Sequence, residues 1–183
     1  MAPGRAPAPG ECLATSAGAS GDRPGAGRSG HALASEAATE TWATRLAGIA
    51  RAGDVVALRG DLGAGKTVFA RAFVRARGSS DEEVPSPTFT LVQTYEGARP
   101  GDAAVWHFDL FRLESALDAL ELGIEDAFAE AISLIEWPER LGGLLPSRRL
   151  ELMLAPGTTA DSRCLHIDAG AEWRRRLHEA GLD

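Results

Sequence analysis

The segment Gly60-Asp-Leu-Gly-Ala-Gly-Lys-Thr67 decides the fold expected for this chain of 183 residues. It matches the phosphate-loop pattern, in which a glycine is followed by any four residues and then by Gly, Lys and Ser or Thr. Glycines permit backbone angles that turn successive N–H groups towards one anion, and the positive end of the next helix adds to that attraction. In a glycine-rich chain the pattern could also match by chance, so the segments on either side must show whether it is a phosphate loop.

The segments on either side of this loop supply the context that a phosphate loop requires. The apolar run Asp54–Arg59 predicts a strand that leads into Gly60. After the loop, apolar residues recur at helical spacing, namely Val68, Phe69, Ala72, Phe73 and Ala76. We therefore expect nucleotide phosphates on this loop, with Lys66 at the β- and γ-phosphates and the Thr67 hydroxyl on Mg²⁺. Lys66 is the only lysine among the 19 basic residues.

Two further apolar strands are predicted, and each ends in an acid. Val105-Trp-His-Phe leads into Asp109, and Ile132-Ser-Leu-Ile leads into Glu136. P-loop enzymes place a carboxylate at such a strand end to hold Mg²⁺ or to orient the attacking water. The alternative is that both acids are ordinary solvated residues. The pattern alone does not say which of the two binds metal.

Several other residues have both a functional and a purely structural interpretation. The hydroxyls of Ser86-Pro-Thr-Phe89 could sense the γ-phosphate, although this segment alone favours an ordinary loop. For His107 a structural role is favoured over a catalytic base, because no nucleophile is visibly paired with it. Arg112 could meet phosphate or pair with Asp109, and Trp137 could pack in the core or cover the site. The Asn-Lys-x-Asp guanine motif is absent, which favours adenine.

The order of predicted elements indicates an α/β fold. Strands alternate with helices, and residues 89–95 and 103–109 read as an antiparallel hairpin. We expect a three-layer P-loop NTPase-like domain over residues 33–170, with a mixed, partly antiparallel central sheet. Residues 1–32, rich in Pro, Gly and Ala, are expected to be a disordered tail, and residues 171–183 a short C-terminal helix.

Composition limits the function classes. The net charge of −7 argues against autonomous nucleic-acid binding, which usually needs a basic face. No apolar run approaches the roughly 20 residues of a membrane span, and the N-terminal residues lack the apolar region of a secretory signal. We therefore expect a cytoplasmic protein without a membrane partner.

These motifs together resemble the bacterial tRNA threonylcarbamoyladenosine biosynthesis ATPase family TsaE, also called YjeE. The resemblance runs from about Thr39 to Arg163 and rests on five elements in order: Gly60–Thr67, Ser86-Pro-Thr-Phe89, His107-Phe-Asp-Leu-Phe-Arg112, Leu122-Gly123 and Ile135-Glu-Trp-Pro138. Phe111 stands where the family usually has tyrosine, and Val68 where a second threonine is common.

The resemblance implies an ATPase that is weakly active alone and works with TsaB and TsaD proteins, which modify tRNA, so that tRNA is contacted only indirectly. ATP hydrolysis would reset that complex. By resemblance, Thr67 and Glu136 would bind Mg²⁺, and Lys66, Asp109 and Glu136 would be the catalytic residues. Nucleotide contacts would come from Thr39, Asp61, Leu62, Gly63, Ala64, Gly65, Lys66, Thr67, Ser86, Thr88, Trp137 and Arg163.

Two alternatives to an accessory ATPase remain open from the sequence. A P-loop kinase that phosphorylates a small metabolite would use the same loop and strand-end acids, although no arginine-rich lid is evident in the middle of the sequence. A nucleotide-controlled binding module that barely hydrolyses ATP would share the whole site and differ only in rate.

Overall fold

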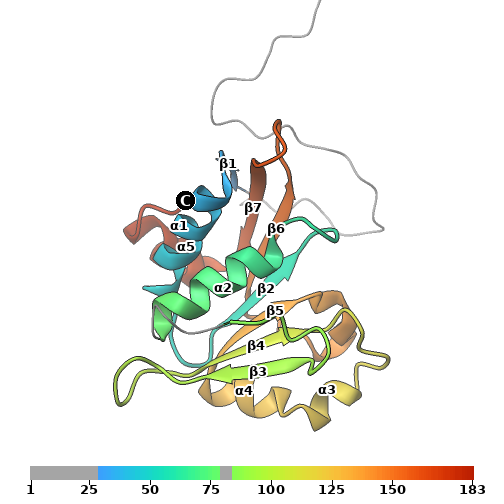
Figure 1. The fold of residues 1–183 in the computed structure, drawn as a ribbon. Helices are drawn as coiled ribbons and strands as arrows, with labels where there is room; N and C mark the ends of the chain where they lie inside the picture. Colours follow the sequence, from blue (N-terminus) through green and yellow to red (C-terminus); the bar gives the residue numbers. More distant parts are fainter. Residues whose placement is uncertain (1–28, 79–83) are drawn as a thin grey trace, which may run out of the picture.

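The computed structural model describes residues 29–78 and 84–183. These residues form one mixed sheet of seven strands with helices on both faces (Figure 1). The strands are β1 (Ser29–Leu33), β2 (Val55–Arg59), β3 (Val92–Tyr95), β4 (Val105–Asp109), β5 (Ile132–Glu136), β6 (Leu150–Pro156) and β7 (Arg163–Ala169). The helices are α1 (Glu36–Ala47), α2 (Lys66–Arg77), α3 (Asp118–Glu121), α4 (Ile124–Glu130), the 3₁₀ segment η1 (Pro138–Leu144) and α5 (Ala171–Glu179).

The strand order is β1-β7-β6-β2-β5-β4-β3, with a parallel centre and antiparallel edges. Strands β6, β2, β5 and β4 run parallel to one another, whereas β7 and β1 on one side and β3 on the other are antiparallel to their neighbours. The expected mixed sheet and the hairpin of β3 and β4 are therefore confirmed. In such a sheet the carboxyl ends of the parallel strands lie together along one side of the sheet, across the strand ends, and ligands usually bind there.

The domain has three layers, because helices cover both faces of the sheet and pack on it through two separate apolar clusters. On one face, α1, α2 and α5 bury Trp42, Phe69, Phe73 and Trp173 against the sheet. On the other face, α3, α4 and η1 enclose a second cluster that contains Phe108, Ile124, Ile135 and Leu141. All five residues of β5 are buried, which is typical of a central parallel strand covered on both faces.

The prediction of a disordered tail over residues 1–32 is wrong for its last part. Ser29–Leu33 form strand β1, which pairs antiparallel with β7 and buries Leu33. Pairing with β7 satisfies the backbone groups on one side of this edge strand, although Ser-Gly-His-Ala-Leu has little strand propensity of its own. The rest of the expected tail, residues 1–28, lies outside the described residues.

The strand predicted over residues 89–95 begins only at Val92. Leu91 has a φ of +63°, and its amide donates to the carbonyl of Pro87 at 2.6 Å, so the preceding residues form a tight turn. The turn leaves the Phe89 side chain 83% exposed. It also brings Ser86 and Thr88 over the end of β4, where the candidate site lies.

Candidate functional site

The loop between β2 and α2 has the geometry of an anion cradle. Gly60, Gly63 and Gly65 all have φ in the left-handed region, at +134°, +79° and +103°. A Cβ on Gly60 would lie 2.3 Å from the carbonyl oxygen of Leu154, so only glycine fits there. Among the described residues no side chain caps the start of α2, which leaves its first amides available to a ligand.

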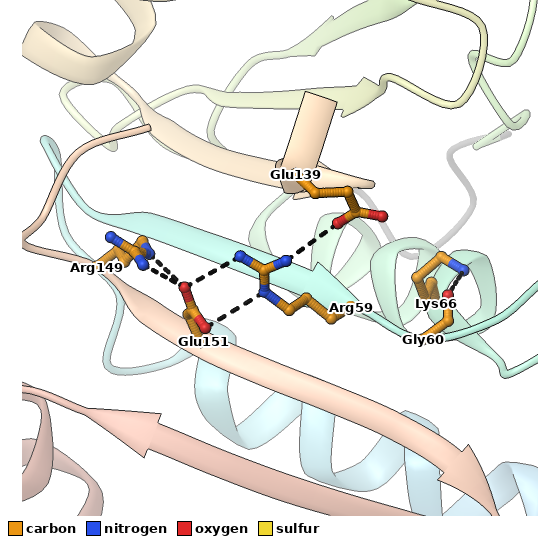
Figure 2. A network of polar contacts seen from close by, with 6 residues as sticks. All are labelled: Arg59, Gly60, Lys66, Glu139, Arg149 and Glu151. Carbon is orange, nitrogen blue, oxygen red and sulfur yellow. Dashed lines mark hydrogen bonds and ion pairs between the residues drawn. The ribbon is translucent and has the colours of Figure 1, made fainter. Parts of the chain in front are cut away.

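Lys66 is the buried cation of this loop. Its Nζ donates to the carbonyl oxygens of Gly60 at 2.6 Å and Asp61 at 2.9 Å, as Figure 2 shows for Gly60. The same ammonium lies 3.9 Å from the ring centroid of Trp137. Burial lowers the pKa of Lys66, and the nearby carboxylate of Glu136 counteracts part of that effect. The Lys66 ammonium thus rests on the loop's own carbonyls, from which it could turn towards phosphate oxygens.

Thr67, Glu136 and His107 form a continuous polar chain. The hydroxyl of Thr67 donates to Oε2 of Glu136 at 3.0 Å, and Nε2 of His107 lies 2.9 Å from Oε1 of the same carboxylate. The side chains of His107 and Glu136 are 0% and 3% exposed. The carboxylate therefore has one oxygen towards the loop and the other towards β4.

Asp109 is the second buried carboxylate of the site. Oδ2 of Asp109 accepts hydrogen bonds from Ser86 at 3.2 Å and Thr88 at 2.7 Å, and Oδ1 accepts one from the amide of Phe111 at 3.2 Å. The loop that carries the two hydroxyls is therefore fastened to the end of β4 through one carboxylate. Such an attachment can respond to a change of charge nearby.

The sheet register explains why these groups meet. Glu136 is paired with Leu58 on β2 and with Asp109 on β4, so both acids lie at the same edge as the phosphate loop. The loop follows β2 directly, which places Lys66 and Thr67 above this edge. The two acids expected at strand ends are thus adjacent residues of neighbouring parallel strands.

A network of arginines and glutamates supports the base of the loop (Figure 2). Arg59, the last residue of β2, donates to Glu139 at 3.2 Å and to Glu151 at 3.3 Å. Burial raises the pKa of Glu151, but hydrogen bonds from Arg149 and Arg59 outweigh it, so the pKa lies below its ordinary value. Arg59 thus joins β2 and β6 to the segment that begins after Trp137.

Trp137 lies beside the loop in a constrained backbone conformation. It has φ of +60°, and its ring centroid is 4.9 Å from that of Phe111. Its amide donates to the carbonyl of Leu58 at 3.3 Å, which fixes the turn that follows β5. Trp137 therefore contacts both the Lys66 ammonium and the Phe111 ring and forms part of the wall of the site.

Thr39 and Arg163 lie next to Gly65, at the start of α2. Thr39 and Arg163 border a small pocket of about 40 Å³ together with Glu36, Gly65, Val68 and Asp161. Arg163 donates to the carbonyl of Ala64 at 3.0 Å, whereas the hydroxyl of Thr39 donates to Ser35 at 3.4 Å. Asp61, Leu62 and Gly63 are exposed at the tip of the loop. Thr39 and Arg163 thus lie beside the loop, whereas Ser86 and Thr88 join the site through Asp109.

The oxygens of Thr67 and Glu136 fit a Mg²⁺ ion. Mg²⁺ prefers oxygen ligands in an octahedron at about 2.1 Å, which puts neighbouring ligands about 3.0 Å apart. The Thr67 hydroxyl and Oε2 of Glu136 are separated by 3.0 Å. The loop beside them has the amides and the ammonium that a polyphosphate needs, so the donor set fits both a metal and a nucleotide.

The pairing of His107 with Glu136 escaped the sequence analysis. Strand alternation places His107 and Asp109 on one face of β4, which is a usable signal. The partner of His107, however, lies on a different strand, and the pair forms only because of the register between β4 and β5. The supporting role of Arg59 was missed for the same reason.

The fold and this site define an α/β protein of the P-loop NTPase-like class. The chain belongs to the family described as threonylcarbamoyl adenosine biosynthesis protein TsaE, whose model matches residues 33–165. The family that the motifs resemble is therefore confirmed. Within the part of the chain that the structure describes, we find no helix with the length and apolarity of a membrane span.

Individual relatives agree with this assignment. The tRNA threonylcarbamoyladenosine biosynthesis protein TsaE of Rickettsia conorii is 40% identical over 124 residues, which is 68% of this chain and 69% of that protein. The protein of the same name from Mycobacterium tuberculosis is 37% identical over 133 residues, 68% of this chain and 77% of its own. The crystal structure of YdiB from Bacillus subtilis superposes with a TM-score of 0.68 at 25% identity, over 85% of this chain and 95% of that one.

Proposed function

We propose that this protein binds ATP and Mg²⁺ on the loop Gly60–Thr67 and hydrolyses the ATP as an accessory subunit in threonylcarbamoyladenosine modification of tRNA. The observation that carries the proposal is the meeting of Lys66, Thr67, Glu136 and Asp109 at one edge of the sheet. Membership of the TsaE family supports the pathway.

The loop amides and Lys66 would bind the phosphates. The left-handed conformations of Gly63 and Gly65 turn the backbone around one point, as a phosphate requires. The ammonium of Lys66 would leave the carbonyls of Gly60 and Asp61 for the β- and γ-phosphates. A buried cation that rests on weak carbonyl acceptors would gain much from a polyphosphate.

Thr67 and Glu136 would hold Mg²⁺, and Asp109 would act near the γ-phosphate. When bound, the metal would neutralise charge on the phosphate oxygens. Asp109 holds Ser86 and Thr88, so a γ-phosphate beside them would compete for the same hydroxyls. We propose that the loop 86–88 reports ATP in this way, as switch segments do.

Thr39, Arg163 and Trp137 would complete the nucleotide site. Arg163 holds the Ala64 carbonyl and thereby steadies the loop next to Gly65. Thr39 and Arg163 border a small hollow next to Gly65, so both would lie beside the bound nucleotide. Trp137 would shield the phosphates on the opposite side, close to Lys66.

TsaB and TsaD type proteins are the proposed partners, in the cytoplasm, with tRNA contacted only through them. Leu62 at the tip of the loop and Phe89 in the turn before β3 are 81% and 83% exposed, which would suit residues covered by another protein. The net charge of −7 suits contact with protein better than contact with nucleic acid. ATP hydrolysis would then reset the modifying complex between turnovers.

The test is release of phosphate from ATP by the full chain, alone and with the partner pair and tRNA. We expect stimulation by the partners and loss of both binding and turnover in Lys66→Ala. Arg75→Ala, which removes an exposed cation from the same helix, serves as the matched control and should behave like wild type. No stimulation, with unchanged tRNA modification when the protein is omitted, would refute the proposal. Transfer of the γ-phosphate to a small metabolite would support a kinase instead.

A further inference from the structure

His107 is a buried titratable residue to which the proposed function gives no task. Its side chain is 0% exposed, and it lies on β4 two residues before Asp109. Its Nε2 is 2.9 Å from Oε1 of Glu136, a residue that is itself 2% exposed. A histidine in this place could be simple core packing, or it could control the carboxylate that it touches.

The hydrogen bonds around Glu136 have one consistent direction. A carboxylate accepts hydrogen bonds, so Nε2 of His107 carries the hydrogen that is donated to Oε1. The other oxygen, Oε2, accepts from the Thr67 hydroxyl at 3.0 Å. Among the described residues, Nδ1 of His107 has no hydrogen-bond partner. The imidazole therefore makes its one polar contact to Glu136.

We infer that His107 is a positioning residue: it holds Oε1 of Glu136 so that Oε2 faces Thr67 at the spacing of two magnesium ligands. This inference rests on the proposed function, in which Thr67 and Glu136 bind Mg²⁺. His107 is not a catalytic residue, because Glu136 lies between it and the phosphate loop. Residues that orient a metal-binding carboxylate usually change metal affinity by about 10- to 100-fold when they are removed.

The experiment measures the gain in nucleotide affinity that Mg²⁺ provides. ATP is titrated into the full chain by calorimetry, once with Mg²⁺ and once with a chelator, and the ratio of the two Kd values is the magnesium gain. We expect His107→Leu to lower this gain about 10- to 100-fold while affinity without metal changes little. His107→Gln keeps an N–H donor near the position of Nε2 and should retain most of the gain.

Two further variants exclude a general loss of stability. Leu165→Ala removes a fully buried side chain from β7, which β6 and β2 separate from β5, and should keep the wild-type magnesium gain despite a lower melting temperature. His107→Asn has the same amide as His107→Gln but is too short to reach Glu136. If His107→Leu does not fold, the comparison of magnesium gain between the Asn and Gln variants tests the inference instead.

A magnesium gain in His107→Leu equal to wild type, or equal gains in the Asn and Gln variants, would overturn the inference and leave the proposed function standing. Wild-type protein that binds ATP without any gain from Mg²⁺ would instead refute the metal site on which the inference rests. The two failures are therefore distinguishable in one set of titrations.

Discussion

Replacement of Gly60 by alanine tests whether the phosphate loop is held in place by the neighbouring strand. Gly60 has a φ of +134°, a region that only glycine occupies readily. A Cβ at this position would lie 2.3 Å from the carbonyl oxygen of Leu154 in β6 and 3.0 Å from Cβ of Ala64. The first of these is a backbone atom in a paired strand, so it cannot turn aside.

The expected cost has two parts. The backbone strain of a non-glycine residue here is about 1–3 kcal/mol. The forced separation of the loop from β6 resembles overpacking and costs about 1–3 kcal/mol more. We therefore expect the free energy of unfolding to fall by about 2–6 kcal/mol. Because the loop must move, the folded fraction should also bind ATP less tightly.

Gly63→Ala is the matched control in the same loop. Gly63 has a φ of +79°, but nothing lies within 4 Å of a Cβ built there, so only a strain of about 1–2 kcal/mol applies. Urea unfolding of the full chain, followed by fluorescence, gives both values. If the two variants had equal free energies of unfolding, the close approach of Gly60 to β6 would not matter, and the reasoning would be refuted.

Two other predictions follow from the contacts around the loop and at the far end of β2. ATP with Mg²⁺ should change the tryptophan emission, because Lys66 would leave the Trp137 ring, whose centroid is now 3.9 Å from its ammonium. In a fluorescence titration, Trp137→Phe should abolish this change, whereas Trp106→Phe should keep it. An unaltered response in Trp137→Phe would contradict the movement of Lys66. Arg176→Met should lower the free energy of unfolding by about 3–5 kcal/mol, because it leaves Asp54 without its buried partner at 2.6 Å. ATP affinity measured by calorimetry should stay at the wild-type value, since Asp54 lies before β2 and the phosphate loop lies after this strand.

The sequence predicted the centre of the fold because local signals agree there. An apolar strand, three glycines and a helix with regular apolar spacing leave one common interpretation for residues 54–77. The edges were predicted less well. Strand β1 has a weak pattern and exists because β7 offers it a partner, and the turn before Val92 depends on a left-handed Leu91.

The candidate site was predicted as a set of residues but not as an arrangement. Asp109 and Glu136 were both expected at strand ends, because each follows an apolar run. That these two residues are direct neighbours depends on the order and register of strands far apart in the sequence. A local pattern contains neither, so the contacts of His107 and Arg59 could not be derived from it.

The polar chain through Glu136 has a consequence for the fold as well as for the site. All five residues of β5 are buried on both faces, so the usual alternation of apolar and polar residues does not define how this strand pairs with β4. A slip of one residue would turn Glu136 away from Thr67 and His107 and leave a buried carboxylate without its partners, which is costly. The hydrogen bonds that shape the site therefore also penalise the wrong register. These hydrogen bonds therefore explain why β5, although apolar, places Glu136 beside the phosphate loop in one register only.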